Sequence, residues 1–444
     1  MSDSSVARKE RVIRVDALAR VEGEGALCLT IRNGEVEAAR LKIYEPPRFF
    51  EAFLRGRDFR EVPDITARIC GICPVAYQMS SCHALENALG VAGQIDPGIR
   101  TMRNLLYCGE WIESHVLHAF LLHLPDFLGY ESAISMAQDH RPLVQRALKL
   151  KKLGNEIIAT LAGRAVHPVG VCVGGFYSLP PADRWAGLLP ALKAGLDDIC
   201  ELTLFLAEKV EYPDFEQDYE FVALCPDDEY PMNLGPIASS KGFCVEQEEY
   251  LSVVEEKQAA YSTALQATVQ GRGPYHVGPL ARLNLNAAKL HPRAAELLPR
   301  VCRAVGQGLP WRNSFLSLPA RALETVHALA LAVDILENYD PPARSRVPVQ
   351  PRAGAGAAAT EAPRGVLWHR YETDQEGLIR SARIIPPTSQ NQLQIEADLR
   401  KLAGELLHLD DEHLGLRCEH LIRNYDPCLS CSTHFLTLRV DRRP

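Results

Sequence analysis

Regular alternation of apolar and polar residues is clearest near the start of the chain. Leu27–Ile31 and Val36–Ile43 both alternate, and the Asn33-Gly34 pair between them is a favourable two-residue hairpin turn. Alternation with a period of two predicts strands that bury one face. We therefore expect an N-terminal β region at about residues 12–45.

Beyond residue 74 the apolar residues recur every three or four positions, which is typical of amphipathic helices. This pattern predicts helices at about residues 74–90, 99–124, 138–163, 182–210, 246–270, 290–307 and 313–338. Breaker-rich stretches such as Asp96-Pro97-Gly98 and Arg272-Gly273-Pro274 separate them. The region from about 74 to 340 is thus expected to form a helical body.

The last quarter of the chain changes character again. Residues 341–363 are rich in Pro, Ala and Gly, a composition that predicts a surface loop or linker. Short β-like segments follow at Gly365–Tyr371 and Gly377–Ile385, and a last helix is predicted from about Gln390 to Leu407. The whole pattern indicates an α+β fold that is predominantly α.

Composition narrows the class of protein. With 444 residues the chain can enclose a deep interior, and its net charge of −8 argues against nucleic acid as the main partner. The longest apolar stretches, around Val116–Leu124 and Ala328–Leu336, are too short to cross a bilayer. Because the first residues also lack the apolar core of a secretory signal, we expect a cytoplasmic protein without a membrane span.

Four of the 13 cysteines form two C-x-x-C pairs near opposite ends of the chain. They lie in the phrases R-I-C-G-I-C-P at residues 68–74 and D-P-C-L-S-C-S-T-H at residues 426–434. Each pair places two sulfurs on one tight turn, so four thiolates can converge on one soft metal ion. Spacing alone leaves zinc, nickel and iron open as that metal.

The other nine cysteines are scattered singly, which suits free thiols in a reducing compartment better than disulfides. No further cysteine cluster is present to hold an iron–sulfur centre, and no G-x-G-x-x-G phrase follows a strand to hold a dinucleotide. If the chain carries out redox chemistry, its electrons must therefore leave through another polypeptide.

The residues around the two cysteine pairs resemble those of the large, catalytic subunit of nickel–iron hydrogenases. The chain is most similar to the soluble, NAD(P)-linked group 3b, also called sulfhydrogenases. The resemblance implies that Cys70 and Cys428 are terminal nickel ligands, while Cys73 and Cys431 also bridge to an iron that carries CO and cyanide. It further implies the large-subunit fold of that family, in which long helices form a central bundle.

Two more phrases resemble the family in the same order. Arg20-Val-Glu22-Gly23 is similar to R-[IV]-E-G, whose Glu takes a proton from a terminal cysteine, here Cys428. Arg48-Phe-Phe-Glu51 resembles R-G-L-E, whose Glu binds magnesium, and His434 is implied as the second protein ligand of that ion. Without the resemblance, a carboxylate such as Glu22 is more simply interpreted as a solvated charge.

The phrase A-P-R-G at residues 362–365 resembles a turn beside the iron. The resemblance implies that Pro363 helps to form the pocket for the cyanides and that Arg364 donates a hydrogen bond to a cyanide nitrogen. A fixed, permanently charged guanidinium suits that task in a dry interior. Asp426 is expected to accept hydrogen bonds near Arg364 and to anchor the second cysteine turn.

Other features of the resemblance concern packing and departures from the family pattern. The phrase that contains His167 implies a supporting, structural role for that residue, and the phrase G-P-L-A-R at residues 278–282 matches without any chemistry that we assign. Tyr77 occupies a position where many members have His, and Ser114 one where many have Asp. Tyrosine cannot relay protons like imidazole near neutral pH.

The resemblance implies bidirectional H2 oxidation and proton reduction by heterolytic cleavage. Electrons would pass to a small subunit with iron–sulfur clusters and, through further iron–sulfur and flavin subunits, to NAD(P). A deazaflavin- or heterodisulfide-linked hydrogenase shares this plan of subunits and stays open, as does a non-catalytic scaffold tied by zinc. The related quinone-reactive subunit of respiratory complex I lacks the four cysteines, which argues against that class.

Large subunits of this family are often made as precursors. A maturation protease is expected to remove residues 435–444 after His434, which leaves a single domain of residues 1–434. Within it, we expect the β region, the helical body, the loop at 341–363 and a metal-binding region at 364–434.

Overall fold

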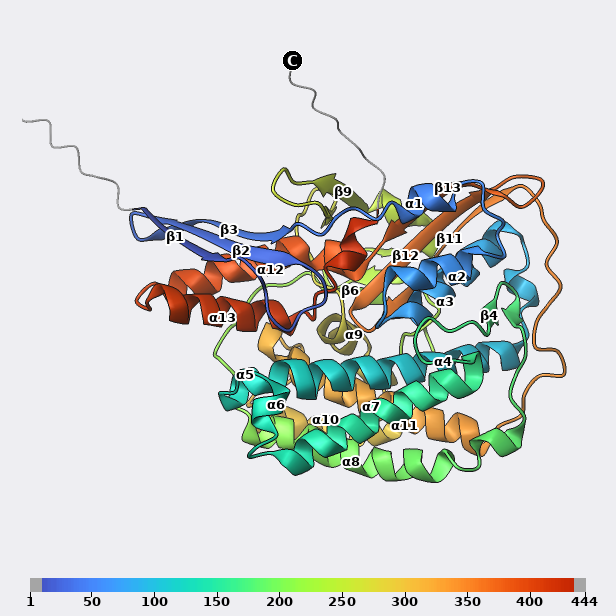
Figure 1. Ribbon diagram of the computed structural model, residues 1–444, viewed down its shortest axis with the longest axis horizontal. Helices are drawn as coiled ribbons and strands as arrows, with labels where there is room; N and C mark the ends of the chain where they lie inside the picture. Colours follow the sequence, from blue (N-terminus) through green and yellow to red (C-terminus); the bar gives the residue numbers. More distant parts are fainter. Residues whose placement is uncertain (1–9, 435–444) are drawn as a thin grey trace, which may run out of the picture.

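The computed structural model describes residues 10–434 and has a bundle of long helices in one half, with most strands and some further helices in the other (Figure 1). The lower half in this view is a bundle built on α4 (Pro97–Val116), α7 (Arg141–Ala162), α8 (Leu189–Lys209) and α11 (Ser317–Glu337), with α10 (Pro292–Ala304) packed on α8 and α11. The structure therefore confirms the predicted α+β class and its central bundle of long helices.

The ends of α4 and α7 follow from their sequence. The Asp96 side chain accepts a hydrogen bond from the Gly98 backbone at 2.7 Å, and Pro97 occupies the first turn of α4. α4 continues as a π-helix over Leu117–His123. α7 ends at Gly163, which has a φ of 87°, a conformation that glycine adopts readily.

α11 is the innermost helix of the bundle. Between residues 10 and 434, only the segment Ser314–Glu337 is long and apolar enough to cross a membrane by length and hydropathy, and 94% of its most apolar window is buried inside the protein. Leu323, Leu329 and Val326 have no exposed surface. Since its neighbours α4 and α8 cover it on two sides, α11 is a core helix.

The N-terminal sheet has the order β1-β2-β3, with antiparallel strands at Glu10–Val15, Gly25–Arg32 and Glu35–Ile43. Asn33 and Gly34 both have positive φ, as the predicted two-residue turn requires. The apolar face of the sheet packs on α12 (Pro387–Glu405). The predicted N-terminal hairpin is therefore confirmed.

A second sheet has the order β11-β12-β13, with strands at Gly354–Ala362, Gly365–Thr373 and Ile379–Ile385. The helix α3 (Pro74–Ala88) lies against β11 and β12. The predicted loop at 341–363 is thus wrong in its second half, where β11 is a mostly buried strand. The small Gly and Ala residues of β11 allow the α3 backbone to approach closely.

The helix predicted at 246–270 is also wrong. A 3-10 helix at Gln247–Ser252 is followed by an antiparallel hairpin of β9 (Val254–Gln258) and β10 (Leu265–Val269). Two helices of eight or more residues were not predicted, α9 (Pro279–Asn286) and α13 (Asp411–Asn424). α13 carries the chain back toward the second cysteine pair.

The remaining elements are short. The helices are α1 (Phe50–Leu54), α2 (Val62–Thr66), α5 (Leu124–Leu128) and α6 (Ala133–Met136). The strands are β4 (Val171–Cys172), β5 (Gly175–Phe176), β6 (Val222–Leu224), β7 (Ile237–Ser239) and β8 (Cys244–Val245). The segment 435–444, for which we expect removal, lies outside the described residues.

The packing of α11 predicts the effect of a cavity. Leu329→Ala should lower the free energy of unfolding by about 2–5 kcal/mol, because this side chain is fully buried and its loss leaves a void. Leu148→Ala, on the outward face of α7 with 51% of the residue exposed, should change it by less than about 0.5 kcal/mol. Urea denaturation followed by circular dichroism measures both, and equal effects would contradict the assignment of α11 to the core.

Candidate metal centre

The two cysteine pairs meet in the interior although more than 350 residues separate them in sequence. Cys70 follows a 3-10 helix at Ala67–Ile69, and Cys73 immediately precedes α3. Cys428 and Cys431 follow α13. All four side chains are buried, and their sulfur atoms lie within 4.8 Å of one another. The predicted convergence of four sulfurs is present.

The sulfur atoms form one compact donor set. Cys70 Sγ lies 3.6 Å from Cys428 Sγ, and the backbone N–H groups of Ile72 and Cys73 point to Cys70 Sγ at 3.4 and 3.2 Å. The structure joins Cys428 and Cys431 as a disulfide, whereas the other cysteines among residues 10–434 are free. A ligand role requires all four as thiolates, and such a set suits nickel, iron or zinc.

The free thiols of the first pair differ in acidity. Burial acts to raise the pKa of Cys70, but the hydrogen bond from Cys73 and the nearby Arg364 guanidinium outweigh it, so that the pKa is lowered. The hydrogen bond to Cys70, together with burial, raises the pKa of Cys73. Cys70 therefore loses its proton more readily than Cys73, and the thiolate is the form that binds a metal.

Glu22 is held beside the second cysteine turn by backbone pairing. Glu22 and Cys428 form a parallel β-bridge, and the Leu429 backbone donates to the Glu22 carbonyl at 2.9 Å. The Glu22 carboxylate then lies 3.0 Å from Cys428 Sγ and accepts from the Ser430 backbone at 3.2 Å and from the Ser430 hydroxyl. The residue after it must be Gly23, because a Cβ there would meet the Ser430 nitrogen at 2.8 Å.

Arg364 is the second residue of the turn between β11 and β12. Its Nε donates to the Asp426 carbonyl at 2.5 Å, and its Nη2 donates to Asp426 Oδ1 at 3.1 Å. Its Nη1 is buried and has no hydrogen-bond partner between residues 10 and 434. A buried, unused donor beside the sulfurs fits an additional anionic acceptor, as the cyanide of the implied iron would be.

Asp426 connects this arginine to the cysteine turn. It has a φ of 50°, a conformation that Asp tolerates better than most residues. Burial raises the pKa of Asp426, although Arg364 and Arg321 act in the opposite direction. The expected contact between Asp426 and Arg364 is therefore present, and it ties β12 to the segment that carries Cys428.

Pro363 and His167 lie at the edge of this arrangement. The Pro363 carbonyl accepts a hydrogen bond from Arg282 at 3.1 Å. His167 Nδ1 lies 2.7 Å from the carbonyl oxygen of Ala67, in the 3-10 helix that leads to Cys70. His167 thus contacts the backbone that supports the first cysteine turn, in line with the structural role expected for it.

Glu51 and His434 lie close to each other and to the backbone of Ile384. His434 Nε2 lies 3.8 Å from Glu51 Oε1 and 2.7 Å from the Ile384 carbonyl oxygen, and the Ile384 N–H donates to Glu51 Oε1 at 2.8 Å. A carboxylate, an imidazole and a carbonyl form a small set that includes the hard oxygen donors preferred by magnesium. Sequence reasoning did not include Ile384, because a backbone carbonyl has no sequence signature.

Three further residues hold the cysteine turns in place and were given no role from the sequence. Arg48 Nη2 donates to the carbonyls of Ile69 and Ser430 at 2.8 and 2.5 Å, and so links the two cysteine segments. The Cys428 N–H donates to Thr388 Oγ1 at 2.9 Å. Glu110 accepts from the first N–H groups of α3, those of Val75 and Ala76, at 2.6 and 3.1 Å. Only Arg48 lay in a phrase that the sequence had singled out.

The two departures from the family pattern are both buried. Tyr77 lies against His369 with a ring separation of 5.6 Å, and its hydroxyl has no partner in the part of the chain that the structure describes. The Ser114 hydroxyl is likewise buried without a partner there. Neighbouring Glu113 pairs instead with Lys151 at 2.8 Å.

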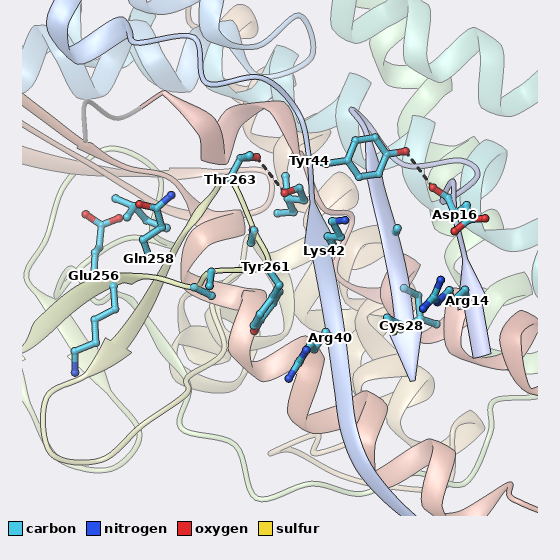
Figure 2. A pocket seen from close by; sticks show the side chains of 18 residues that line it. Arg14, Asp16, Cys28, Arg40, Lys42, Tyr44, Glu256, Gln258, Tyr261 and Thr263 are labelled. Atoms are coloured by element: carbon cyan, nitrogen blue, oxygen red, sulfur yellow. Dashed lines mark hydrogen bonds between the residues drawn. The ribbon is translucent and has the colours of Figure 1, made fainter. Parts of the chain in front are cut away.

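A large groove lies elsewhere, between the N-terminal sheet and the loop that joins β9 to β10 (Figure 2). It has a volume of about 1470 Å³ and is lined by Arg14, Cys28, Arg40, Lys42 and Tyr261, among others. None of the residues that line it belongs to the cysteine cluster. The cluster itself is an interior site.

Comparison with known proteins agrees with this geometry. The model of a family described as nickel-dependent hydrogenase matches residues 48–146 and 236–434, which include both cysteine pairs. The chain belongs to this family. The buried four-cysteine cluster of this hydrogenase supports a nickel–iron centre.

Individual relatives cover nearly the whole hydrogenase chain. It is 35% identical to the alpha subunit of sulfhydrogenase 1 from Pyrococcus furiosus, over 96% of its own length and 98% of that protein. It is 28% identical to a subunit of the F420-non-reducing hydrogenase vhc from Methanococcus voltae, over 95% and 94%. A solved NAD+-reducing [NiFe]-hydrogenase in the H2-reduced state matches with a TM-score of 0.85 and 27% identity, over 96% of this chain and 99% of that one.

The cluster predicts which cysteines the nickel needs. Cys70→Ser should strongly reduce nickel in the purified protein, because a hydroxyl is a poor ligand for a soft metal. Cys82→Ser is the matched control, since Cys82 is fully buried and free but lies outside the cluster, and it should keep the nickel content of the wild type. Elemental analysis measures both. Full nickel in Cys70→Ser, or zinc in place of nickel in the wild type, would contradict the assignment.

Proposed function

We propose that this chain is the catalytic large subunit of a bidirectional, NAD(P)-linked nickel–iron hydrogenase. The observation that carries the proposal is the meeting of four buried sulfurs with Glu22 on one side and the unused Nη1 of Arg364 nearby. When bound, a nickel–iron centre with CO and cyanide on its iron supplies the heterolytic cleavage of H2 and accepts the electrons. The protein supplies ligands, a hydrogen-bond donor and a path for the proton.

In this proposal all four cysteines would hold the nickel, and Cys73 and Cys431 would also hold the iron. Cys428 Sγ holds the proton that leaves H2 and transfers it to Glu22 over the observed 3.0 Å. A metal-bound thiolate can act as a base because coordination keeps it deprotonated. Arg364 would donate through its free Nη1 to a cyanide nitrogen, and Pro363 would help to form the pocket for the cyanides.

We further propose that Glu51, His434 and the Ile384 carbonyl hold a magnesium ion, with water completing its shell. Cleavage after His434 would give that residue a free carboxylate. The His434 carbonyl already accepts from the Glu51 backbone at 3.3 Å, at the start of α1. A new negative charge at that position would strengthen the hydrogen bond that the Glu51 N–H already donates to it.

For the electrons we propose an iron–sulfur small subunit, followed by iron–sulfur and flavin subunits that reduce NAD(P) in the cytoplasm. The support is the similarity to one chain of a sulfhydrogenase and to a NAD+-reducing hydrogenase. Similarity to a chain of an F420-non-reducing hydrogenase keeps a different electron partner, such as a heterodisulfide-linked one, as the second candidate. H2-dependent reduction of NAD+ or NADP+ by the purified complex, with a flavin subunit present, favours the first candidate over the second.

Infrared spectroscopy of the purified complex tests the proposed cofactor. Bands in the CO and cyanide region are expected together with nickel in the same sample. A protein that contains nickel but shows no such bands would exclude the diatomic ligands and, with them, the role proposed for Arg364.

Glu22→Gln should lower H2/D2O exchange by about 10²- to 10⁴-fold while nickel stays bound, because the amide keeps the shape of the side chain but cannot accept the proton. Glu24→Gln is the control. Glu24 is exposed and only two residues away, so this variant should exchange at the wild-type rate. Mass-spectrometric detection of HD measures exchange, and wild-type exchange in Glu22→Gln would remove Glu22 from the proton path.

Mass spectrometry of active protein should give a chain that ends at His434. The expected reason is that the terminal carboxylate completes the surroundings of the proposed magnesium ion, which an uncleaved peptide bond cannot do. Protein without nickel should retain residues 435–444. Full activity in a chain that still ends at Pro444 would show that this cleavage is not required.

A further inference from the structure

The phrase at residues 278–282 contributes no ligand to the metal centre, yet it lies directly against the turn that carries Arg364. Arg282 has no exposed surface. Its Nη1 donates to the Ala362 carbonyl at 2.9 Å, and its Nη2 donates to the Pro363 carbonyl at 3.1 Å. One guanidinium thus binds the two carbonyls that immediately precede Arg364.

The turn between β11 and β12 is short and buried. Ala362 pairs with Gly365 across it, so only Pro363 and Arg364 form the connection. Pro363 has no N–H group to donate, and the turn is buried, where an unpaired carbonyl is costly. Without Arg282, the carbonyl oxygens of Ala362 and Pro363 would lose the hydrogen bonds that it donates to them.

Gly278, at the other end of the phrase, lies directly against the Arg364 backbone. It has a φ of 114°, and a Cβ at this position would lie 2.8 Å from the Arg364 carbonyl oxygen. Only glycine fits such a contact without moving the turn. The phrase therefore holds the turn in two ways: Gly278 allows its backbone to lie against Arg364, and Arg282 binds the two preceding carbonyls.

Arg282 is itself held rigidly by its surroundings. Its Nε and Nη2 donate to the two oxygens of Glu324 at 2.8 and 2.7 Å, and its Nη1 also donates to Glu361 Oε2 at 2.9 Å. The guanidinium carbon lies 4.5 Å from the centre of the Trp111 ring. Both carboxylates are fully buried, so the orientation of the guanidinium is set by a planar, multidentate contact.

We propose that Arg282 is a positioning residue of the metal centre. By fixing the Ala362-Pro363 backbone, it determines where the Arg364 side chain presents its free Nη1. This inference rests on the proposed function, because the acceptor for that Nη1 is a cyanide of the iron. Arg282 acts only through Arg364 and touches neither the sulfurs nor the substrate.

Arg282→Lys tests the proposal. A lysine keeps the positive charge, but its single ammonium group cannot bind two carboxylates and two carbonyls in a fixed planar arrangement. We expect nickel to remain bound, the cyanide bands in the infrared spectrum to shift or broaden, and H2 oxidation to fall by about 10- to 100-fold, as is usual for residues that orient a metal site. The H2 concentration at half-maximal rate should change little.

Arg103→Lys is the matched control. Arg103 is also buried and forms a two-pronged ion pair with Glu86 at 2.9 and 2.6 Å, but that pair lies outside the turn at 362–365. A purely structural role for Arg282 would make both variants less heat-stable while leaving the cyanide bands unchanged. The proposal requires that the bands change in Arg282→Lys and stay at wild-type positions in Arg103→Lys.

The outcomes separate cleanly. Wild-type protein that contains nickel but shows no cyanide bands would defeat the proposed function itself. If the wild-type protein shows cyanide bands and Arg282→Lys shows the same bands unchanged, the positioning role is rejected while the proposed function stands. If Arg282→Lys does not load metal, the cyanide bands of Gly278→Ala test the proposal instead. The added Cβ in that variant would push the Arg364 backbone away. Unchanged bands in that variant would reject the proposal, and shifted bands would support it.

Discussion

Arg364 and Asp426, both buried, join the turn between β11 and β12 to the second cysteine turn. The arginine belongs to the turn between β11 and β12, and the aspartate begins the turn that carries Cys428 and Cys431. Removing two charges from water offsets much of their attraction, so the pair adds little to stability. The pair instead fixes the orientation of the Arg364 side chain, and it leaves Nη1 of that side chain unused near the four sulfurs.

The cost of burying unpaired charge also explains the other charged groups near the cluster. Thiolates collected in a dry interior need positive partners, and the Arg364 guanidinium is such a partner for Cys70 and Cys73. Cys73 precedes α3, and the first N–H groups of that helix donate to the buried Glu110 carboxyl. The long helices of the bundle and the small sheets above them hold these groups at fixed distances (Figure 1).

Sequence predicted the parts of this arrangement that depend on local pattern. The N-terminal hairpin and the long helices α4, α7 and α11 followed from periodicity, and the contacts Glu22–Cys428 and Arg364–Asp426 followed from the family resemblance. β11 was missed because its Gly and Ala residues have low strand propensity and are chosen for contact with α3. The segment 246–270 was assigned the wrong element because short apolar runs fit either period, and pairing of β9 with β10 decided between them.

Some features had no sequence signal, and some had one that was overlooked. α13 begins with Asp410 as its N-cap and two further acidic residues, a recognisable start that could have revealed it. The carbonyl of Ile384 and the contacts of Arg282 with Ala362 and Pro363 could not be predicted, because a backbone acceptor is the same in every residue. Long-range contacts of this kind become visible only when the fold is known.

The departure at Tyr77 restricts how a proton can leave the proposed centre. Burial raises the pKa of the Tyr77 hydroxyl well above its usual value, and the nearby thiols Cys73 and Cys70 raise it further. The phenol therefore stays neutral, so it can donate a hydrogen bond but cannot accept and release a proton as imidazole does near pH 7. Ser114 provides no carboxylate either. Glu22, 3.0 Å from Cys428 and hydrogen-bonded to Ser430, is then the group best placed to carry the proton away from the sulfurs.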